Sequence, residues 1–267
     1  IQRSRGLGDV YKRQVKTIDK IIDAIFQVQG GYALTMMTNK KLVGIRDPYG
    51  IRPLVLGKLK DSYILSSETC ALDIIGADFI REIENGEIVV IDKNGVESIK
   101  PFPKVPARPC VFEYVYFSRP DSIVGGKAVH EYRKKLGEEL AKELSIDADI
   151  VSAVPDSGIP AAIGYSNQSK ITYDMGIIRN HYVGRTFIEP TQQIRQLGVK
   201  LKHNANKEII KNKRLILVDD SIVRGTTSKK LVDMLYNAGA KEIHLCISSP
   251  PIRPVSYTHL RAHETSG

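Results

Sequence analysis

Residues 129–248 alternate between helical and strand patterns, and this alternation limits the possible folds more than any other feature of the chain. The expected elements are helix 129–144, strand 149–154, helix 159–165, strand 214–218, helix 227–238 and strand 242–248. Strands that alternate with helices form βαβ units, in which the strands run parallel and are covered by helices. The sequence therefore predicts an α/β domain with a mostly parallel sheet flanked by helices.

The residues before this region follow a different pattern. Apolar residues at helical spacing predict a helix over 18–26, which Gly30 and Gly31 follow. Short strands are then expected at 32–38, 42–45, 54–56, 63–65 and 88–91. The prolines between residues 101 and 109 give this stretch the composition of a linker. We therefore predict an antiparallel sheet with a helix or two over 15–107, and a second domain over 108–254.

The two ends of the chain show no sustained periodicity. We predict that residues 1–14 and 255–267 are non-native tails. The formal net charge of +9 has contributions from the first of these segments and from the basic stretch 180–202. The charge alone therefore does not indicate a nucleic-acid partner.

Composition favours a globular protein, with 42% hydrophobic and 26% charged residues. No apolar run approaches the ~18 residues that a membrane span needs. The three cysteines, Cys70, Cys110 and Cys246, are widely spaced and form no CxxC pair, which argues against a secreted disulfide framework. We expect no membrane span and a reducing, cytoplasmic setting.

The stretch LILVDDSIVRGTT (215–227) places two acids, Asp219 and Asp220, at the end of a buried strand and a Gly-Thr-Thr run at the start of a helix. Free backbone amides at a helix start bind phosphate, and a glycine there allows close approach. Adjacent aspartates can accept hydrogen bonds from sugar hydroxyls and hold Mg²⁺. The alternative is that Thr226 is only an N-cap and the aspartates are a solvated strand end.

A second loop, VPDSG (154–158), leaves the end of another expected strand. Ligands bind at the carboxyl ends of strands in open α/β sheets, so this loop and the acidic one are expected to share a site. The alternative is an ordinary turn, with Asp156 or Ser157 capping the next helix and Pro160 in its first turn.

The motif VDDSIVRGTT (218–227) resembles the phosphoribosyl pyrophosphate (PRPP) motif of type I phosphoribosyltransferases, in the version typical of glutamine PRPP amidotransferases. The resemblance covers about residues 15–254. It extends through RDPYGIRPLVLG, SSETCALD, CVFEYVYFSRPDS, VPDSGIPAAIGY, NHYVGRTFIEP and SSPPI. It implies a type I phosphoribosyltransferase fold at 108–254, preceded by the second half of an α+β N-terminal-nucleophile glutaminase domain at 15–107.

The resemblance also assigns residues to parts of PRPP. It implies that Asp219 and Asp220 bind the ribose hydroxyls and the associated Mg²⁺. The 5′-phosphate would be held by Ser221, Arg224, Gly225, Thr226 and Thr227. The pyrophosphate loop would be Asp156, Ser157 and Gly158.

The segment 180–202 is basic and is interrupted by Gly184, Pro190 and Gly198. The resemblance implies a loop that closes over PRPP; the alternative is a solvated basic loop. We assign Arg179, Tyr182 and Arg185, with Asp219 and Asp220, to the catalytic step. His181 stands where the family pattern has Arg.

The implied reaction is that of a glycosyltransferase of purine synthesis: ammonia attacks the ribose C1 and pyrophosphate leaves. In the family the ammonia comes from glutamine, hydrolysed by an N-terminal cysteine. This chain begins with Ile1, and we interpret Cys70 as a helix or core cysteine. We therefore predict a truncated amidophosphoribosyltransferase without glutaminase activity.

Cys110 lies where some family members place one ligand of a [4Fe-4S] cluster. Such a cluster needs four thiolates and the chain has three cysteines, so we expect no cluster here. We interpret Cys246 as a core residue. Mg²⁺ remains the expected cofactor.

Two functions are weighed from the sequence. The first is the enzyme, with PRPP and ammonia or glutamine as substrates, purine nucleotides as feedback inhibitors and homo-oligomers in the full-length protein. The second is a PRPP-binding regulatory module that binds nucleic acid. We find no helix-turn-helix pattern and expect no nucleic-acid partner.

Overall fold

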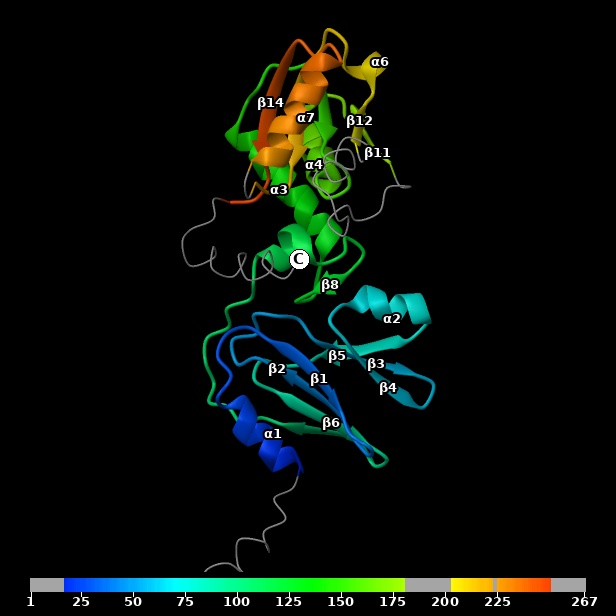
Figure 1. Cartoon of the computed structure of the whole chain (residues 1–267), viewed down its shortest axis with the longest axis vertical. Coiled ribbons are helices and arrows are strands. Elements are labelled where there is room, and N and C mark those ends of the chain that lie inside the picture. Colours follow the sequence, from blue (N-terminus) through cyan, green and yellow to red (C-terminus); the bar gives the residue numbers. More distant parts are fainter. Residues whose placement is uncertain (1–16, 181–202, 223–224, 251–267) are drawn as a thin grey trace, which may run out of the picture. The chain divides into compact units, whose positions relative to one another are not determined.

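The computed structural model describes residues 17–180, 203–222 and 225–250 (Figure 1). The chain folds as two compact units, one up to Cys110 and one from Val111. The division falls just after the proline-rich stretch that the sequence predicts to be a linker. Among the described residues, no helix is long and apolar enough to cross a membrane.

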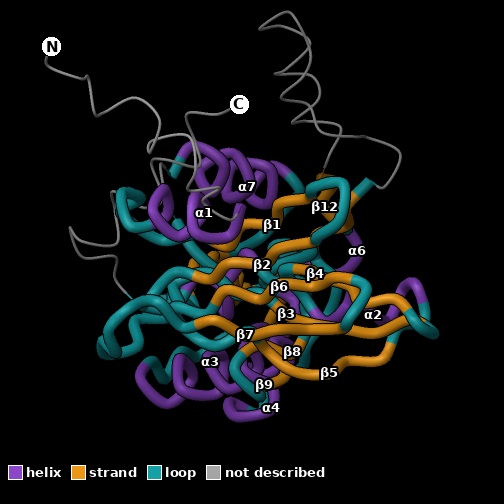
Figure 2. The backbone as a smooth tube through the Cα atoms, turned by 90° about the horizontal axis from the view of Figure 1, so that it is seen from below, coloured by secondary structure: helices purple, strands orange, loops and turns teal. Residues whose placement is uncertain are grey.

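The described residues of the first unit form two antiparallel sheets and two helices. Its elements are α1 (Thr17–Ile25), β1 (Ala33–Met37), β2 (Leu42–Arg46), β3 (Val55–Leu59), β4 (Ser62–Ser66), α2 (Thr69–Ile75), β5 (Asp78–Glu82), β6 (Ile88–Asp92) and β7 (Gly95–Ile99). The strand orders are β1-β2-β6-β7 and β4-β3-β5. Figure 2 shows β1, β2 and β6 side by side in the first of these sheets.

Strand β6 explains how the layers of this unit pack. Alternate side chains of a strand point to opposite faces of its sheet. Ile88 and Val90 pack in a cluster with Ile25 of α1, whereas Val89 and Ile91 pack with Leu56 of β3. The first sheet is thus covered by α1 on one face and by the second sheet on the other.

Every strand predicted for residues 15–107 is present, and Cys70 lies on helix α2 as predicted. Strands β5 and β7 were not predicted. Their burial patterns explain the omission, because β5 begins with three exposed residues and β7 has no fully buried one. Neither strand shows the alternation that identifies a half-buried strand.

Glu87 is a buried carboxylate that joins parts of this unit. It is 1% exposed and accepts two hydrogen bonds from Arg81, one from the Ser98 hydroxyl and one from the Glu84 backbone amide. Burial alone would raise the pKa of Glu87, but the hydrogen bonds from Arg81, Ser98 and Glu84 outweigh it and lower the pKa from 4.5 to about 2. The ionised form is therefore stabilised by folding.

We expect Glu87→Gln to lower the free energy of unfolding at pH 7 by about 2 kcal/mol. Because the folded pKa is depressed, this stabilisation is present above pH 4.5 and is lost as the pH falls through about 2. Denaturant titrations of both proteins across this range measure the difference. Glu97→Gln, at an exposed position of β7, is the control and should change little. A Glu87→Gln difference that stayed constant down to pH 2 would contradict this account.

The second unit holds the predicted parallel sheet. Its elements are η1 (a π-helix, Glu113–Phe117), β8 (Ile123–Val124), β9 (Lys127–Ala128), α3 (Val129–Glu143), β10 (Ile150–Ala153), α4 (Ile159–Ser169), β11 (Ile177–Arg179), β12 (His203–Ala205), α6 (Lys207–Ile210), β13 (Arg214–Asp219), α7 (Thr226–Asn237) and β14 (Glu242–Ile247). Strands β10, β13 and β14 are neighbours in that order and all pair parallel. The α/β prediction is therefore confirmed for this unit.

Both faces of this sheet are covered, as the apolar run in β13 predicts. Leu215 and Leu217 pack with Leu231 and Leu235 of α7. On the other face, Ile216 and Val218 pack with side chains of α3 and α4, Leu140, Ala161, Ala162 and Tyr165. Strand β13 is buried from both sides, so it carries its terminal aspartates to a fixed place at the edge of the sheet.

Helices α3 and α4 pack with their backbones in direct contact. A Cβ at Gly137 would lie 1.8 Å from the Ala161 carbonyl oxygen, and one at Gly164 would lie 1.9 Å from that of Lys134. Only glycine fits at either position. This packing fixes α4, and with it the loop before α4, relative to α3.

Candidate functional site

Loops that follow the three parallel strands meet at one edge of the sheet. The Val154 amide after β10 donates to the Val218 carbonyl of β13 at 2.9 Å. The Ser248 and Ser249 amides after β14 donate to the carbonyls of Asp219 and Asp220, each at 3.0 Å. Backbone hydrogen bonds thus hold the chain on both sides of the acidic pair.

Asp219 and Asp220 are buried, at 9% and 5% exposure. Burial, and then the neighbouring charge of Asp220, raise the pKa of Asp219 to about 7. Burial also raises the pKa of Asp220, although hydrogen bonds from the Ser157 and Ser221 hydroxyls and the positive charge of Arg133 oppose this rise. The alternative of a solvated strand end is therefore wrong.

This donor set fits a divalent cation. Two adjacent, buried carboxylates repel each other, and their oxygens are the ligands that Mg²⁺ prefers. The Asp220 backbone amide donates to the Asp219 carboxylate at 2.9 Å, and the Ser221 hydroxyl donates to the Asp220 carboxylate. Asp219 and Asp220 would therefore hold Mg²⁺, which would offset the charge of both carboxylates.

The start of α7 has the properties of an anion site. Gly225 is the N-cap residue and has a φ of +71°, in the left-handed region that glycine favours. Lys229 makes the first backbone hydrogen bond back to Gly225, at 3.0 Å, so the amides before Lys229 have no acceptor within the helix. Thr226 and Thr227 are exposed. The N-cap position is held by Gly225, so the alternative that Thr226 serves as an N-cap is wrong.

The loop 154–158 packs directly against the acidic pair. The Ser157 hydroxyl bonds to Asp220, and Asp156 forms an ion pair with Arg179. The peptide bond between Pro155 and Asp156 is cis. Gly158, which has no side chain, is the N-cap residue of α4. The alternative that Asp156 or Ser157 is simply a helix cap is therefore wrong.

The structure brings together most of the predicted site residues. Seven of them lie in direct contact with one another or next to one another in the chain: Asp156, Ser157, Gly158, Arg179, Asp219, Asp220 and Ser221. Three more begin the helix that follows: Gly225, Thr226 and Thr227. Tyr182, Arg185, His181 and Arg224 lie outside the described residues.

Cys70, Cys110 and Cys246 are present as thiols rather than disulfides. Within the described ranges, no group of three or more His, Cys, Asp or Glu side chains is arranged to hold a metal ion.

Two residues at this site were not predicted from the sequence. Arg133 on α3 is 4% exposed, and its guanidinium donates to the carbonyls of Tyr114 at 2.7 Å and Ser118 at 2.8 Å. Arg133 lies four residues from both Val129 and Gly137, on the buried face of α3. An arginine at helical spacing among buried residues was the signal in the sequence that could have identified it. The second residue is His203, whose Nε2 lies 3.4 Å from the Pro155 carbonyl oxygen.

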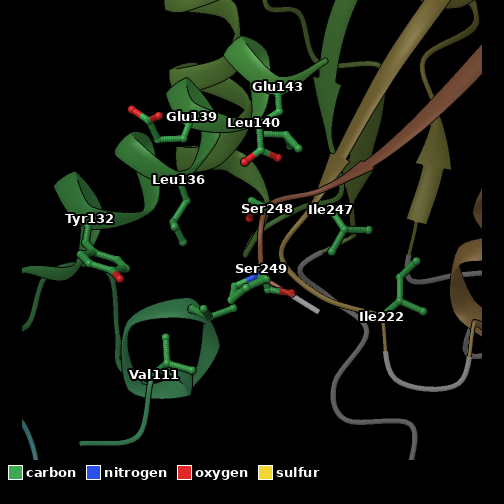
Figure 3. Close-up of a pocket in the computed structure, with 12 residues that line it drawn as sticks. Val111, Tyr132, Leu136, Glu139, Leu140, Glu143, Ile222, Ile247, Ser248 and Ser249 are labelled. Atoms are coloured by element: carbon green, nitrogen blue, oxygen red, sulfur yellow. The ribbon is translucent and has the colours of Figure 1, made fainter. Parts of the chain in front are cut away.

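A cavity of about 710 Å³ is lined in part by Ser248 and Ser249, the residues whose amides bond to the backbone of the acidic pair (Figure 3). Figure 3 shows Tyr132, Leu136 and Leu140 of α3 along one wall and Ser249 at another. Ile222 also lines it. None of the predicted site residues that the structure describes lines this cavity, so it is separate from the proposed substrate contacts.

Comparison with known proteins places the second unit in a family. The model of the family described as "Phosphoribosyl transferase domain" matches residues 126–265. A protein of Rhizobium etli named amidophosphoribosyltransferase is 59% identical over 245 residues, which are 90% of this chain and 49% of that protein. One of the same name from Mycobacterium bovis is 52% identical and aligns with 87% of this chain and 44% of its own length.

A solved structure shares the fold of both units. It is the glutamine PRPP amidotransferase from B. subtilis, complexed with ADP and GMP, with a TM-score of 0.83 and 46% identity. The match covers 91% of this chain and 54% of that one. This chain thus spans about half the length of the relatives that it matches.

Proposed function

Because this chain belongs to the phosphoribosyltransferase family, we propose that the carboxyl edge of its parallel sheet binds PRPP with Mg²⁺. One observation carries the proposal. The loop between β13 and α7 has two buried carboxylates where it leaves the strand, and backbone amides without a helical acceptor where it enters the helix. The first can bind ribose hydroxyls and a cation, and the second can bind the 5′-phosphate.

The resemblance to amidophosphoribosyltransferases is confirmed by the relatives of that name. We therefore propose that the site transfers the phosphoribosyl group to ammonia. The ammonia lone pair forms the new bond to the ribose C1 as the bond from C1 to the pyrophosphate oxygen breaks, and that electron pair leaves with pyrophosphate. The ammonium formed at C1 then loses a proton to give phosphoribosylamine.

The residues contribute mainly by position and charge. In this proposal Asp219 and Asp220 fix the ribose, and the amides at the start of α7 fix the phosphate, so C1 has one orientation. Arg179 would exchange its partner Asp156 for the departing pyrophosphate, whose charge it would stabilise. Tyr182, Arg185 and Arg224, outside the described ranges, are proposed to contribute to the same binding.

The longer relatives suggest the setting of this reaction. We propose that ammonia is supplied by glutamine hydrolysis in the whole protein, within purine synthesis, and that purine nucleotides inhibit it. The solved structures, one complexed with ADP and GMP and one of an allosteric regulatory enzyme of purine biosynthesis, support this. A homo-oligomer and a cytoplasmic setting stay predictions. The relatives favour the enzyme over the nucleic-acid module.

We expect the chain to release pyrophosphate from PRPP when ammonia and Mg²⁺ are present. A coupled assay for pyrophosphate measures the rate, and calorimetry with PRPP and Mg²⁺ measures binding separately. Asp220→Ala should remove both, since it deletes one of the two carboxylates. Unchanged PRPP affinity in Asp220→Ala would show that the site has been assigned wrongly.

A further inference from the structure

Strands β11 and β12 form an antiparallel pair that contacts the loop 154–158. Arg179 stands directly opposite His203 in this pair. Directly opposite residues of an antiparallel pair share one face of the sheet. Arg179 is ion-paired with Asp156, and His203 Nε2 lies 3.4 Å from the Pro155 carbonyl oxygen. One face of the pair therefore contacts two consecutive residues of the loop.

The core of the second unit holds His203 in place. His203 and Ala205 are buried at 9% and 7% exposure, whereas Asn204 between them is exposed. Ala205 and Ile177 of the opposite strand belong to the cluster that contains Leu215. The strand pair that carries His203 is thus anchored in the cluster that also contains residues of β13.

The two loop contacts of this strand pair differ in exposure. The side chains of Arg179 and Asp156 are 36% and 51% exposed, so their ion pair can open when an anion binds. His203 is buried, and its contact with the loop is to a backbone carbonyl. A carbonyl only accepts hydrogen bonds, so in this contact Nε2 would be the donor.

A contact with the Pro155 carbonyl orients more than one atom. The carbonyl and the amide of the following residue lie in one peptide plane. Holding the Pro155 oxygen therefore also sets the direction of the Asp156 amide. That amide belongs to the loop proposed to bind pyrophosphate, where backbone N–H groups would face the anion.

We propose that His203 is a positioning residue for pyrophosphate binding, which acts by holding the Pro155 carbonyl and hence the Asp156 amide. The inference rests on the proposed function, because it takes this loop to be the pyrophosphate site. His203 itself need not touch the substrate. Its effect should therefore be confined to ligands that occupy the loop.

The test compares two ligands in the full chain by calorimetry: Mg²⁺-pyrophosphate, and ribose 5-phosphate, whose phosphate would lie at the start of α7. We expect His203→Leu to weaken pyrophosphate binding by about threefold to tenfold, as for the loss of one hydrogen bond, and to leave ribose 5-phosphate binding unchanged. His203→Gln should keep most of the pyrophosphate affinity, because its amide can donate to the same carbonyl. Asn204→Ala, at the exposed neighbour, is the control.

Each other outcome contradicts the inference. Equal weakening of both ligands by His203→Leu would show a general structural role, and unchanged pyrophosphate affinity would show no role. A His203→Gln variant as weak as His203→Leu would exclude the hydrogen bond as the cause. If the unmodified chain bound neither ligand, the proposed function itself would fail; if it bound both, only the positioning role is in question.

Discussion

Asp219→Asn is expected to abolish Mg²⁺-dependent PRPP binding and, at the same time, to stabilise the metal-free fold. The pKa of Asp219 is raised from 3.8 to about 7 by burial and by the charge of Asp220. At pH 8 the folded protein therefore holds a carboxylate that would be more stable in the unfolded chain. Asparagine removes this charge but keeps an oxygen for the Asp220 amide, which donates to Asp219 at 2.9 Å.

The size and direction of the pH dependence follow from the same shift. A raised folded pKa means that the free energy of unfolding of the unmodified chain falls as the pH rises from 3.8 to about 7. At pH 8, without metal, we expect Asp219→Asn to be more stable by about 2–4 kcal/mol. The difference should shrink towards pH 4, where Asp219 is protonated in the folded protein.

Thermal melts with a chelator across pH 4–8 measure the stability difference, and calorimetry with PRPP and Mg²⁺ measures binding. Asp233→Asn is the matched control, because Asp233 is an exposed aspartate on α7. It should change neither quantity. Loss of stability in Asp219→Asn at pH 8 would refute the electrostatic account, and retained PRPP binding would refute the assigned role.

The sequence was sufficient to predict the elements that carry this site. β13 was expected over 214–218 and is Arg214–Asp219, and α7 was expected over 227–238 and is Thr226–Asn237. Both predictions succeeded because apolar residues at a regular period are buried on a known face. The acidic pair was predicted as a ligand site because an apolar strand, two aspartates and a Gly-Thr-Thr run at a helix start form a specific string together.

The contacts made across the fold could not be predicted in this way. His203 shows no pattern in its own segment, and its partner Pro155 is distant in sequence. The capping alternatives for Thr226 and Asp156 are also local in sequence, and only the observed backbone excluded them. Periodicity identifies the face that a residue occupies, whereas these contacts depend on which loops the fold brings together.

Gly158 makes a contact of this kind with the end of β13. Although glycine has no functional group, Gly158→Ala is expected to weaken PRPP binding. Its φ of −75° suits any residue, so its backbone conformation does not require glycine. Space does: a Cβ would lie 2.5 Å from the Val218 carbonyl oxygen and 3.3 Å from the Asp219 Cα. Alanine must therefore push the loop 154–158 away from the strand end that carries the acidic pair.

We expect Gly158→Ala to lower the free energy of unfolding by about 1–3 kcal/mol and PRPP affinity by more than about tenfold. Gly57→Ala is the control, because its Cβ would lie 2.6 Å from the Leu72 side chain in the first unit, which does not carry this loop. It should destabilise the fold while the folded fraction keeps its PRPP affinity. Equal affinities in the two variants would mean that the loops do not depend on this contact. Loss of PRPP affinity in Gly158→Ala alone would show that PRPP binding depends on the spacing between the two loops. That spacing is possible because Gly158 has no side chain.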